Sequence, residues 1–339
     1  MTEIERYFED FIHLPRVLLK TLGYDFPGIA RPLPTKCLMR LYFMLALISC
    51  LYCTYFVAKI ALSEVANGVQ DLPLLLSLID DILHNGTAIL KSYYFLCKIK
   101  SQEDLYQRLR EIYPASLDDR MAYCVNDYYW PKWIRKTIYI QFCAITLIVL
   151  LPLAETLIEY IMALLKVGYA DAEFAYHILY EDHNYFMNHQ SPLGYVLVYL
   201  MLTMGTHYAI IFNICPDIWL VAYAMQLCMH FDYISNKLKN YEPEETKTER
   251  DLEVIAELVR KHQILLELAN DLREIFSFLV LFMLFSTVAT LFGPLIFILT
   301  QGVNLDINGY LAFLPTNLGQ YFMVRYYGQQ IINKVYNLY

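Results

Sequence analysis

Two groups of cysteine and histidine side chains have the residue types that bind metals or carry out redox chemistry. Cys50 and Cys53 form a C-x-x-C pair, a spacing found in redox-active disulfides and in half of a zinc site. They lie in the apolar run LISCLYC, where a thiolate is strongly disfavoured. The sequence therefore favours a role in helix packing for both side chains over redox chemistry or zinc binding. His177, His183 and His189 recur every six residues, whereas zinc ligands on a helix lie about three to five residues apart. This spacing favours a solvated acidic loop over a metal or pH-sensing site, and we expect no metal and no cofactor.

Catalytic motifs are absent from the sequence. It lacks a nucleophile elbow, a phosphate-binding glycine loop, a metalloprotease helix motif and the paired histidines of membrane di-iron enzymes. We therefore predict that the protein is not an enzyme. The formal net charge of −8 gives no reason to expect a nucleic acid as a partner, because nucleic-acid binding needs clustered positive charge.

Aromatic and polar side chains at helical spacing indicate a surface that could contact a small molecule. Their spacing of four residues places them along one stripe of a helix. The stripe consists of Tyr195, Tyr199, Thr203 and His207. A shorter stripe farther along the chain holds Tyr310, Phe313 and Asn317. Membrane helices also use this composition for packing against one another, so the stripes alone leave both interpretations open.

Carboxylates interrupt two of the apolar stretches. Asp80 and Asp81 lie in one stretch, and Glu155 and Glu159 lie near the end of another. A charge inside a membrane must face a protein interior or a wet cavity. Two interpretations therefore stay open for Asp80 and Glu155: hydrogen bonding between helices near the membrane interface, or a polar lining of an outward-facing pocket.

The elements that must position these groups are membrane helices. Hydrophobic residues make up 58% of the 339 residues and charged residues 18%, and the mean hydropathy of +0.36 exceeds that of an ordinary soluble chain. A crossing helix needs about 20 mostly apolar residues. The predicted spans are about 41–62, 72–97, 137–160, 193–222, 274–300 and 307–329. The second of them is the weakest by composition, because Asp80, Asp81 and Lys91 interrupt it.

The distribution of lysine and arginine decides whether 72–97 crosses. Residues 1–40 hold six basic residues, 98–136 hold eight and 231–273 hold seven, whereas 63–71 and 301–306 hold none. Basic residues accumulate in cytoplasmic loops, and this alternation requires 72–97 to cross. The prediction is an all-α membrane protein with six spans and a cytoplasmic N-terminus, the inverse of a G-protein-coupled receptor.

A layer of helices is also expected on the cytoplasmic side. The fourth span continues as a helix to Asn240, past Asp217. Between Asp251 and Arg273, apolar residues keep helical spacing with charges between them, which predicts an amphipathic helix that leads into the fifth span. Water would otherwise wet its apolar stripe, so this helix must pack within the chain or against other subunits.

The C-terminal half resembles the insect odorant receptor family. The likeness is strongest from Tyr199 to Ile332, where a long helix with Asp217 is followed by RKHQILLELANDLREIFSFLVLFMLFSTVATLFGPL and then by YYGQQI. Tyr326, Tyr327 and Gly328 look like the family's aromatic-aromatic-Gly signature. Residues 1–332 would then form one odorant-receptor-like transmembrane domain, with 333–339 as a short cytoplasmic tail.

The resemblance implies a receptor subunit in the plasma membrane of olfactory sensory neurons. It would bind a small volatile organic ligand in an outer-half pocket and form a ligand-gated, non-selective cation channel with the odorant co-receptor, as a hetero-tetramer in membrane lipid. The family's pockets draw on the second, third, fourth and sixth helices. Carried onto this sequence, that favours the Tyr195–His207 stripe with Tyr310 and Phe313, and it adds Leu76 and Leu151 as apolar lining.

The resemblance also implies a seventh helix that lines the pore, which INKVYNLY is too short to form. The expectation is thus a truncated or incomplete chain that keeps a pocket and lacks its share of the pore. Two other functions stay open: a gustatory receptor of the same superfamily, and a secondary transporter that would use Asp80 and Glu155. The sequence has no inverted internal repeat of the kind that many transporters contain.

Overall fold

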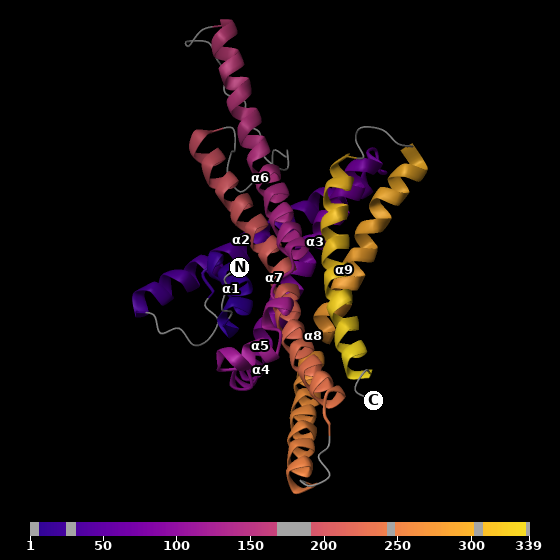
Figure 1. Cartoon of the computed structure of the whole chain (residues 1–339). Helices are drawn as coiled ribbons and strands as arrows, with labels where there is room; N and C mark the ends of the chain where they lie inside the picture. The colour runs from indigo at the N-terminus through magenta and orange to yellow at the C-terminus, as the bar shows by residue number, and fades with distance from the viewer. Residues whose placement is uncertain (1–6, 25–31, 168–190, 243–247, 302–307, 337–339) are drawn as a thin grey trace.

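The protein is a bundle of long helices in the computed structural model, which describes residues 7–24, 32–167, 191–242, 248–301 and 308–336 (Figure 1). Within these ranges, helices and short turns account for the whole fold. The helices are α1 (Phe8–Thr21), α2 (Leu33–Ala66), α3 (Leu72–Cys97), α4 (Ile99–Glu111), α5 (Leu117–Ala122), the 3₁₀ helix η1 (Val125–Tyr128), α6 (Lys132–Val167), α7 (Pro192–Lys239), α8 (Thr248–Gln301) and α9 (Asn308–Tyr336).

Each of the six ranges predicted as spans coincides with part of one long helix, to within a residue. The range 72–97, the weakest by composition, has the same bounds as α3. By length and hydropathy, three helices of the described chain could cross a membrane: α2, α7 and α8. The two predicted continuations are confirmed, because α7 runs to Lys239 and α8 runs without interruption from Thr248 to Gln301.

Local sequence explains where two of these helices begin. The carboxylate of Asp71 accepts a hydrogen bond from the backbone N–H of Leu74 at 2.9 Å, and Pro73 occupies the first turn of α3. The hydroxyl of Ser191 accepts from the N–H of Gly194 at 3.2 Å, and Pro192 is the first residue of α7. A side-chain acceptor at the N-cap satisfies a free N–H, and proline lacks the N–H that would otherwise be unpaired there.

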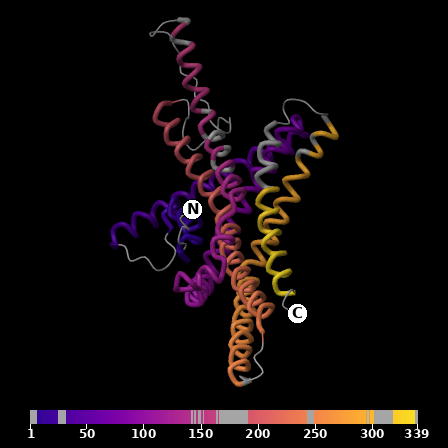
Figure 2. The backbone as a smooth tube through the Cα atoms, in the orientation of Figure 1, coloured from indigo at the N-terminus to yellow at the C-terminus, as the bar shows by residue number. Residues whose placement is uncertain are grey.

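Helix α7 is the centre of the bundle. It packs against α1, α2, α3, α8 and α9, and nearly every residue from Tyr208 to Phe231 is buried. Both views show α7 running through the middle of the bundle, with α8 and α9 as an antiparallel pair on one side (Figures 1 and 2). The upper part of α6 extends beyond its neighbours in the same views.

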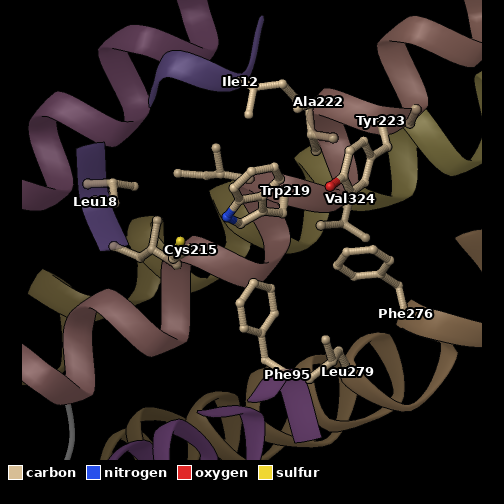
Figure 3. Close-up of a cluster of buried hydrophobic side chains, with 14 of the residues drawn as sticks. Ile12, Leu18, Phe95, Cys215, Trp219, Ala222, Tyr223, Phe276, Leu279 and Val324 are labelled. Atoms are coloured by element: carbon tan, nitrogen blue, oxygen red, sulfur yellow. The ribbon is translucent and has the colours of Figure 1, made fainter. Parts of the chain in front are cut away.

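The core lies around Trp219 on α7. Trp219 is fully buried and its ring centroid lies 5.5 Å from that of Tyr223, which in turn lies 6.2 Å from Phe276 of α8. Phe95 of α3 and Val324 of α9 reach the same cluster (Figure 3). Side chains of α1, α3, α8 and α9 therefore pack with those of α7 in one apolar core.

The cysteine pair on α2 contributes to the packing beside this core. Cys50 and Cys53 are both buried free thiols, and Cys53 packs with Tyr195, Val198 and Leu202 of α7. The packing interpretation of the C-x-x-C pair is therefore confirmed. The predicted histidine group, His177, His183 and His189, lies outside the described residues.

Candidate ligand-binding site

An aromatic cluster joins α2, α6 and α7 near the start of α7. Tyr195 is 6% exposed, and its ring stacks on that of Tyr199 with the centroids 5.8 Å apart. Its hydroxyl lies 3.4 Å from the hydroxyl of Thr156 on α6, which is also buried. Apolar side chains complete the cluster: Tyr52, Cys53, Phe56 and Ile60 of α2, Leu153 of α6, and Val198 and Leu202 of α7. The cluster offers apolar surface, two ring faces and hydroxyl groups in one place.

The two ends of the predicted stripe on α7 face different neighbours. Tyr199 hydrogen-bonds with Thr203 one turn further on, so these two residues belong with Tyr195. The Nε2 atom of His207 instead lies 3.3 Å from the hydroxyl of Thr21 on α1, and its Nδ1 atom lies 3.3 Å from the hydroxyl of Tyr42 on α2. Because α1 and the first half of α2 cover this turn of α7, His207 links those helices while the tyrosines lie against α6.

The remaining predicted site residues are dispersed. Leu76 is half-buried on α3, whereas Leu151 is 59% exposed on α6. Glu155 is exposed on α6. Tyr310 and Phe313 belong to α9, but their side chains lie outside the part of the chain that the structure describes. The structure thus brings Tyr195, Tyr199 and Thr203 together and leaves the contribution of the other predicted residues a prediction.

Asp80 faces the interior of the bundle between α3 and α8. It is half-buried, and its Oδ1 atom is buried without a hydrogen-bond partner among the described residues. The side chain of Thr290 on α8 lies near the same carboxylate. This contact fits the interhelical interpretation of Asp80, and its role in lining a pocket stays a prediction.

A buried ion pair that the sequence patterns did not predict crosses the centre of the bundle. Lys91 of α3 lies 2.9 Å from Asp217 of α7, and each side chain is 2% exposed. The Nζ atom of Lys91 also donates to the backbone oxygen of Asn213 at 2.9 Å, so its hydrogen-bonding capacity is satisfied. A signal was present in the sequence, because Lys91 and Asp217 are charges of opposite sign, each in a largely apolar stretch. The two residues are 126 positions apart, so no local sequence pattern indicates that they pair.

Two cavities lie at the end of the bundle where α5 and η1 meet the C-terminal part of α7. We call this the basic end, because the Lys/Arg-rich segments 98–136 and 231–273 meet there. One cavity of about 380 Å³ is lined by the signature residues Tyr326 and Tyr327 together with Trp133. In its wall, Lys334 of α9 donates to Asp232 of α7 at 2.6 Å, and Tyr128 of η1 donates to the same carboxylate. The third signature residue, Gly328, has open space where a Cβ atom would lie.

The second cavity, of about 500 Å³, lies between the end of α4, α5, α7 and α8. His230 is 4% exposed in its wall, and its Nε2 atom has no hydrogen-bond partner among the described residues. Burial, followed by the positive charge of Lys261, lowers the pKa of His230 from 6.5 to about 3, so the imidazole is neutral at physiological pH. Burial also raises the pKa of Tyr123, whose ring meets His230 edge-on at 5.2 Å.

The fold defines an all-helical protein, within the described residues, with helices long and apolar enough to cross a membrane. A family model described as 7tm Odorant receptor matches residues 82–338. The chain therefore belongs to the odorant receptor family, which is a family of sensory receptors and not of enzymes. Its place in olfaction and sensory transduction follows from this membership.

Individual relatives agree with the family assignment. The chain is 26% identical to Odorant receptor 49a of Drosophila melanogaster over 340 residues, covering 98% of this chain and 82% of that protein. It is 26% identical to Odorant receptor 85f of the same organism over 334 residues, with the same coverage. Its fold resembles the structure of the insect olfactory receptor OR5 from Machilis hrabei, with a TM-score of 0.57 at 12% identity, over 97% of this chain and 83% of that one.

Proposed function

We propose that this chain is a ligand-binding odorant receptor subunit that detects a small volatile organic molecule in the outer half of the membrane. The observation that carries the proposal is the stacked pair of Tyr195 and Tyr199 beside Thr156, surrounded by apolar side chains of α2, α6 and α7. A site with apolar walls and a small number of polar groups suits a small, mostly apolar ligand. The ring faces supply contact area, and the hydroxyls favour ligands that carry one hydrogen-bonding group.

The experiment compares odorant responses of variants expressed together with the odorant co-receptor. Tyr199→Ala removes a ring that is half-buried in the cluster, and we expect the odorant concentration for half-maximal current to rise about tenfold, as a lost aromatic contact of ~1.4 kcal/mol implies. Tyr199→Phe keeps the ring and tests the hydroxyl alone. Tyr55→Ala is the matched control, because Tyr55 is 67% exposed on α2. Equal dose–response curves for Tyr199→Ala and Tyr55→Ala across an odorant panel would reject this cluster as the ligand site.

The same proposal includes the membrane topology and the channel. We infer six crossings by α2, α3, α6, α7, α8 and α9, with the N-terminus and the basic end in the cytoplasm of an olfactory sensory neuron. The alternation of basic segments supports this orientation. Pairing of Lys91 with Asp217 supports the crossing by α3, because it neutralises both charges within the bundle. An epitope at Met1 is expected to stay inaccessible to antibody on intact cells and to become accessible after permeabilisation.

Assembly with the co-receptor gives a further test. We expect agonist-gated cation current when this chain and the odorant co-receptor are expressed together, and no current from this chain alone. Current that is independent of the co-receptor would favour a gustatory-type receptor. Uptake of substrate without agonist-gated current would favour a transporter.

A further inference from the structure

A proline interrupts the hydrogen-bond ladder of α7 in the middle of the bundle. Pro216 is buried inside α7, which continues on both sides of it from Pro192 to Lys239. Proline has no backbone N–H, so the carbonyl of Phe212, four residues earlier, loses its helical donor. The ring also crowds that carbonyl. A membrane helix tolerates such a break where neighbouring groups satisfy the backbone, and sharp kinks occur most often at proline.

The contacts of Lys91 lie on both sides of this break. Its Nζ atom donates to the backbone oxygen of Asn213, three residues before Pro216, at 2.9 Å. It also donates to both carboxylate oxygens of Asp217, one residue after Pro216, at 3.1 and 2.9 Å. Since Lys91 belongs to α3, one ammonium group of another helix joins the two halves of α7 where their own ladder is weakest.

Other contacts from α3 hold α7 just before the proline. The side-chain amide of Asn213 donates to the backbone oxygen of His84 on α3 at 3.0 Å and lies 3.1 Å from the ring Nε2 of that residue. The hydroxyl of Tyr208 on α7 donates to that of Ser92 on α3 at 2.7 Å. Both contacts join α3 to the half of α7 that precedes Pro216, whereas Lys91 also bonds the carboxylate that follows it.

We propose that Pro216 is a hinge in α7 and that Lys91 is the residue that holds this hinge closed. The aromatic cluster at Tyr195 lies before the hinge, and the Asp232–Lys334 ion pair at the basic end lies after it. A change in the angle at Pro216 moves these two parts of α7 relative to each other. The hinge itself depends only on the contacts within the bundle, and its consequence for gating rests on the proposed receptor function.

The test measures hydrogen–deuterium exchange of the backbone amides in the range 213–220, where Pro216 itself has none, in protein reconstituted in lipid nanodiscs. The variant Lys91→Met with Asp217→Asn removes the hinge contacts and leaves no unpaired buried charge. We expect amides 213–220 to exchange at least about tenfold faster than in the wild type, because charged hydrogen bonds are lost at a weak point. Adding Pro216→Ala restores the donor for Phe212 and is expected to return exchange to within about threefold of wild type.

Two further variants keep the proposal falsifiable. Lys334→Met with Asp232→Asn removes another ion pair on α7 and is expected to leave amides 213–220 unchanged. Pro216→Ala alone is expected to slow their exchange, and it tests the hinge even if the Lys91 variant does not fold. The proposal is overturned if the Lys91 variant exchanges at the wild-type rate, if added Pro216→Ala does not slow it, or if Pro216→Ala alone exchanges like the wild type.

Current recordings then separate the hinge from the receptor function. In cells that also express the odorant co-receptor, we expect the Lys91→Met, Asp217→Asn variant to shift the odorant dose–response, and Pro216→Ala to reverse that shift. Absence of any odorant response in the wild type would refute the receptor function while leaving the exchange result intact. A normal dose–response in a variant with fast exchange would refute the link between the hinge and gating.

Discussion

Replacement of Gly205 tests how closely α2 and α7 approach each other. Gly205 is buried on α7 against α2. A Cβ atom at this position would lie 2.8 Å from Sγ of Cys53 and 2.9 Å from the backbone carbonyl carbon and oxygen of Ser49. These contacts are shorter than van der Waals distance, and the carbonyl of Ser49 belongs to the rigid backbone of α2. Gly205→Ala therefore forces the two helices apart.

The magnitude follows from comparison with Gly328, another helical glycine. A Cβ on Gly328 would have no neighbouring atom within 4 Å. Both alanine variants gain about 0.5–1 kcal/mol from the helix propensity of alanine over glycine. Overpacking costs typically about 1–3 kcal/mol, and only Gly205→Ala carries that cost. The difference between the free energies of unfolding of the two variants thus gives the cost of the clash at residue 205. We expect this difference to be about 1–3 kcal/mol.

Thermal unfolding of detergent-solubilised protein provides the assay. Gly205→Ala is expected to melt below Gly328→Ala by several degrees, at roughly 2–4 °C per kcal/mol. Gly86→Ala on α3 serves as a second control, because its added Cβ also meets nothing within 4 Å. If all three alanine variants melted at the same temperature, α2 and α7 would have room for a methyl group, and the close approach would be refuted.

Three further predictions concern charged and titratable groups. Lys91→Met leaves the Asp217 carboxylate buried and unpaired, so it should lower the free energy of unfolding by about 3–5 kcal/mol. Adding Asp217→Asn removes the unpaired charge and should recover most of this loss. His230 has a pKa of about 3 in the folded protein and 6.5 in the unfolded chain, so the free energy of unfolding falls as the pH drops below 6.5. The expected loss is about 1.5–2 kcal/mol at pH 5. His230→Asn should remove this pH dependence, as measured by denaturant titrations. Arg108→Ala breaks a half-exposed pair with Asp271 and should cost less than about 1 kcal/mol, with a smaller cost at high salt.

Each of these predictions has a result that contradicts it. Wild-type stability of Lys91→Met would mean that Asp217 is not held as a buried carboxylate. A pH dependence that persists in His230→Asn would assign it to another group. A loss of several kcal/mol for Arg108→Ala, unchanged by salt, would show that this pair is more deeply buried than its exposed fractions of 33% and 36% indicate.

Much of the helical layout follows from patterns local in sequence. Apolar stretches interrupted by turn and capping residues predict long helices, and the bounds of α3 agree with the predicted range 72–97. The amphipathic spacing after Asp251 predicts the continuous helix α8. The packing of Cys50 and Cys53 was predictable for the same reason, since their neighbours in the sequence are apolar.

The binding cluster was predicted in part. The spacing of four residues correctly places Tyr195, Tyr199 and Thr203 on one stripe of α7. It could not show that α1 and α2 enclose His207, because a stripe on one helix does not identify the helix that covers each of its turns. The docking of α1 depends on contacts such as the indole N–H of Trp130, which donates to the backbone oxygen of Phe11 at 3.0 Å. These residues are 119 positions apart.

Hydropathy and ordered motifs, read along the chain, were enough to establish a helical membrane protein of the odorant receptor family. Which polar groups meet was settled only by the packing of the helices. In the sequence, the charge of Lys91 disfavours a membrane span. In the structure, this charge is stabilised inside the bundle, because Asp217 and the backbone oxygen of Asn213 on α7 accept hydrogen bonds from it. The stability of a buried charge depends on its partner in space, and residues more than a hundred positions apart become partners only when their helices pack together.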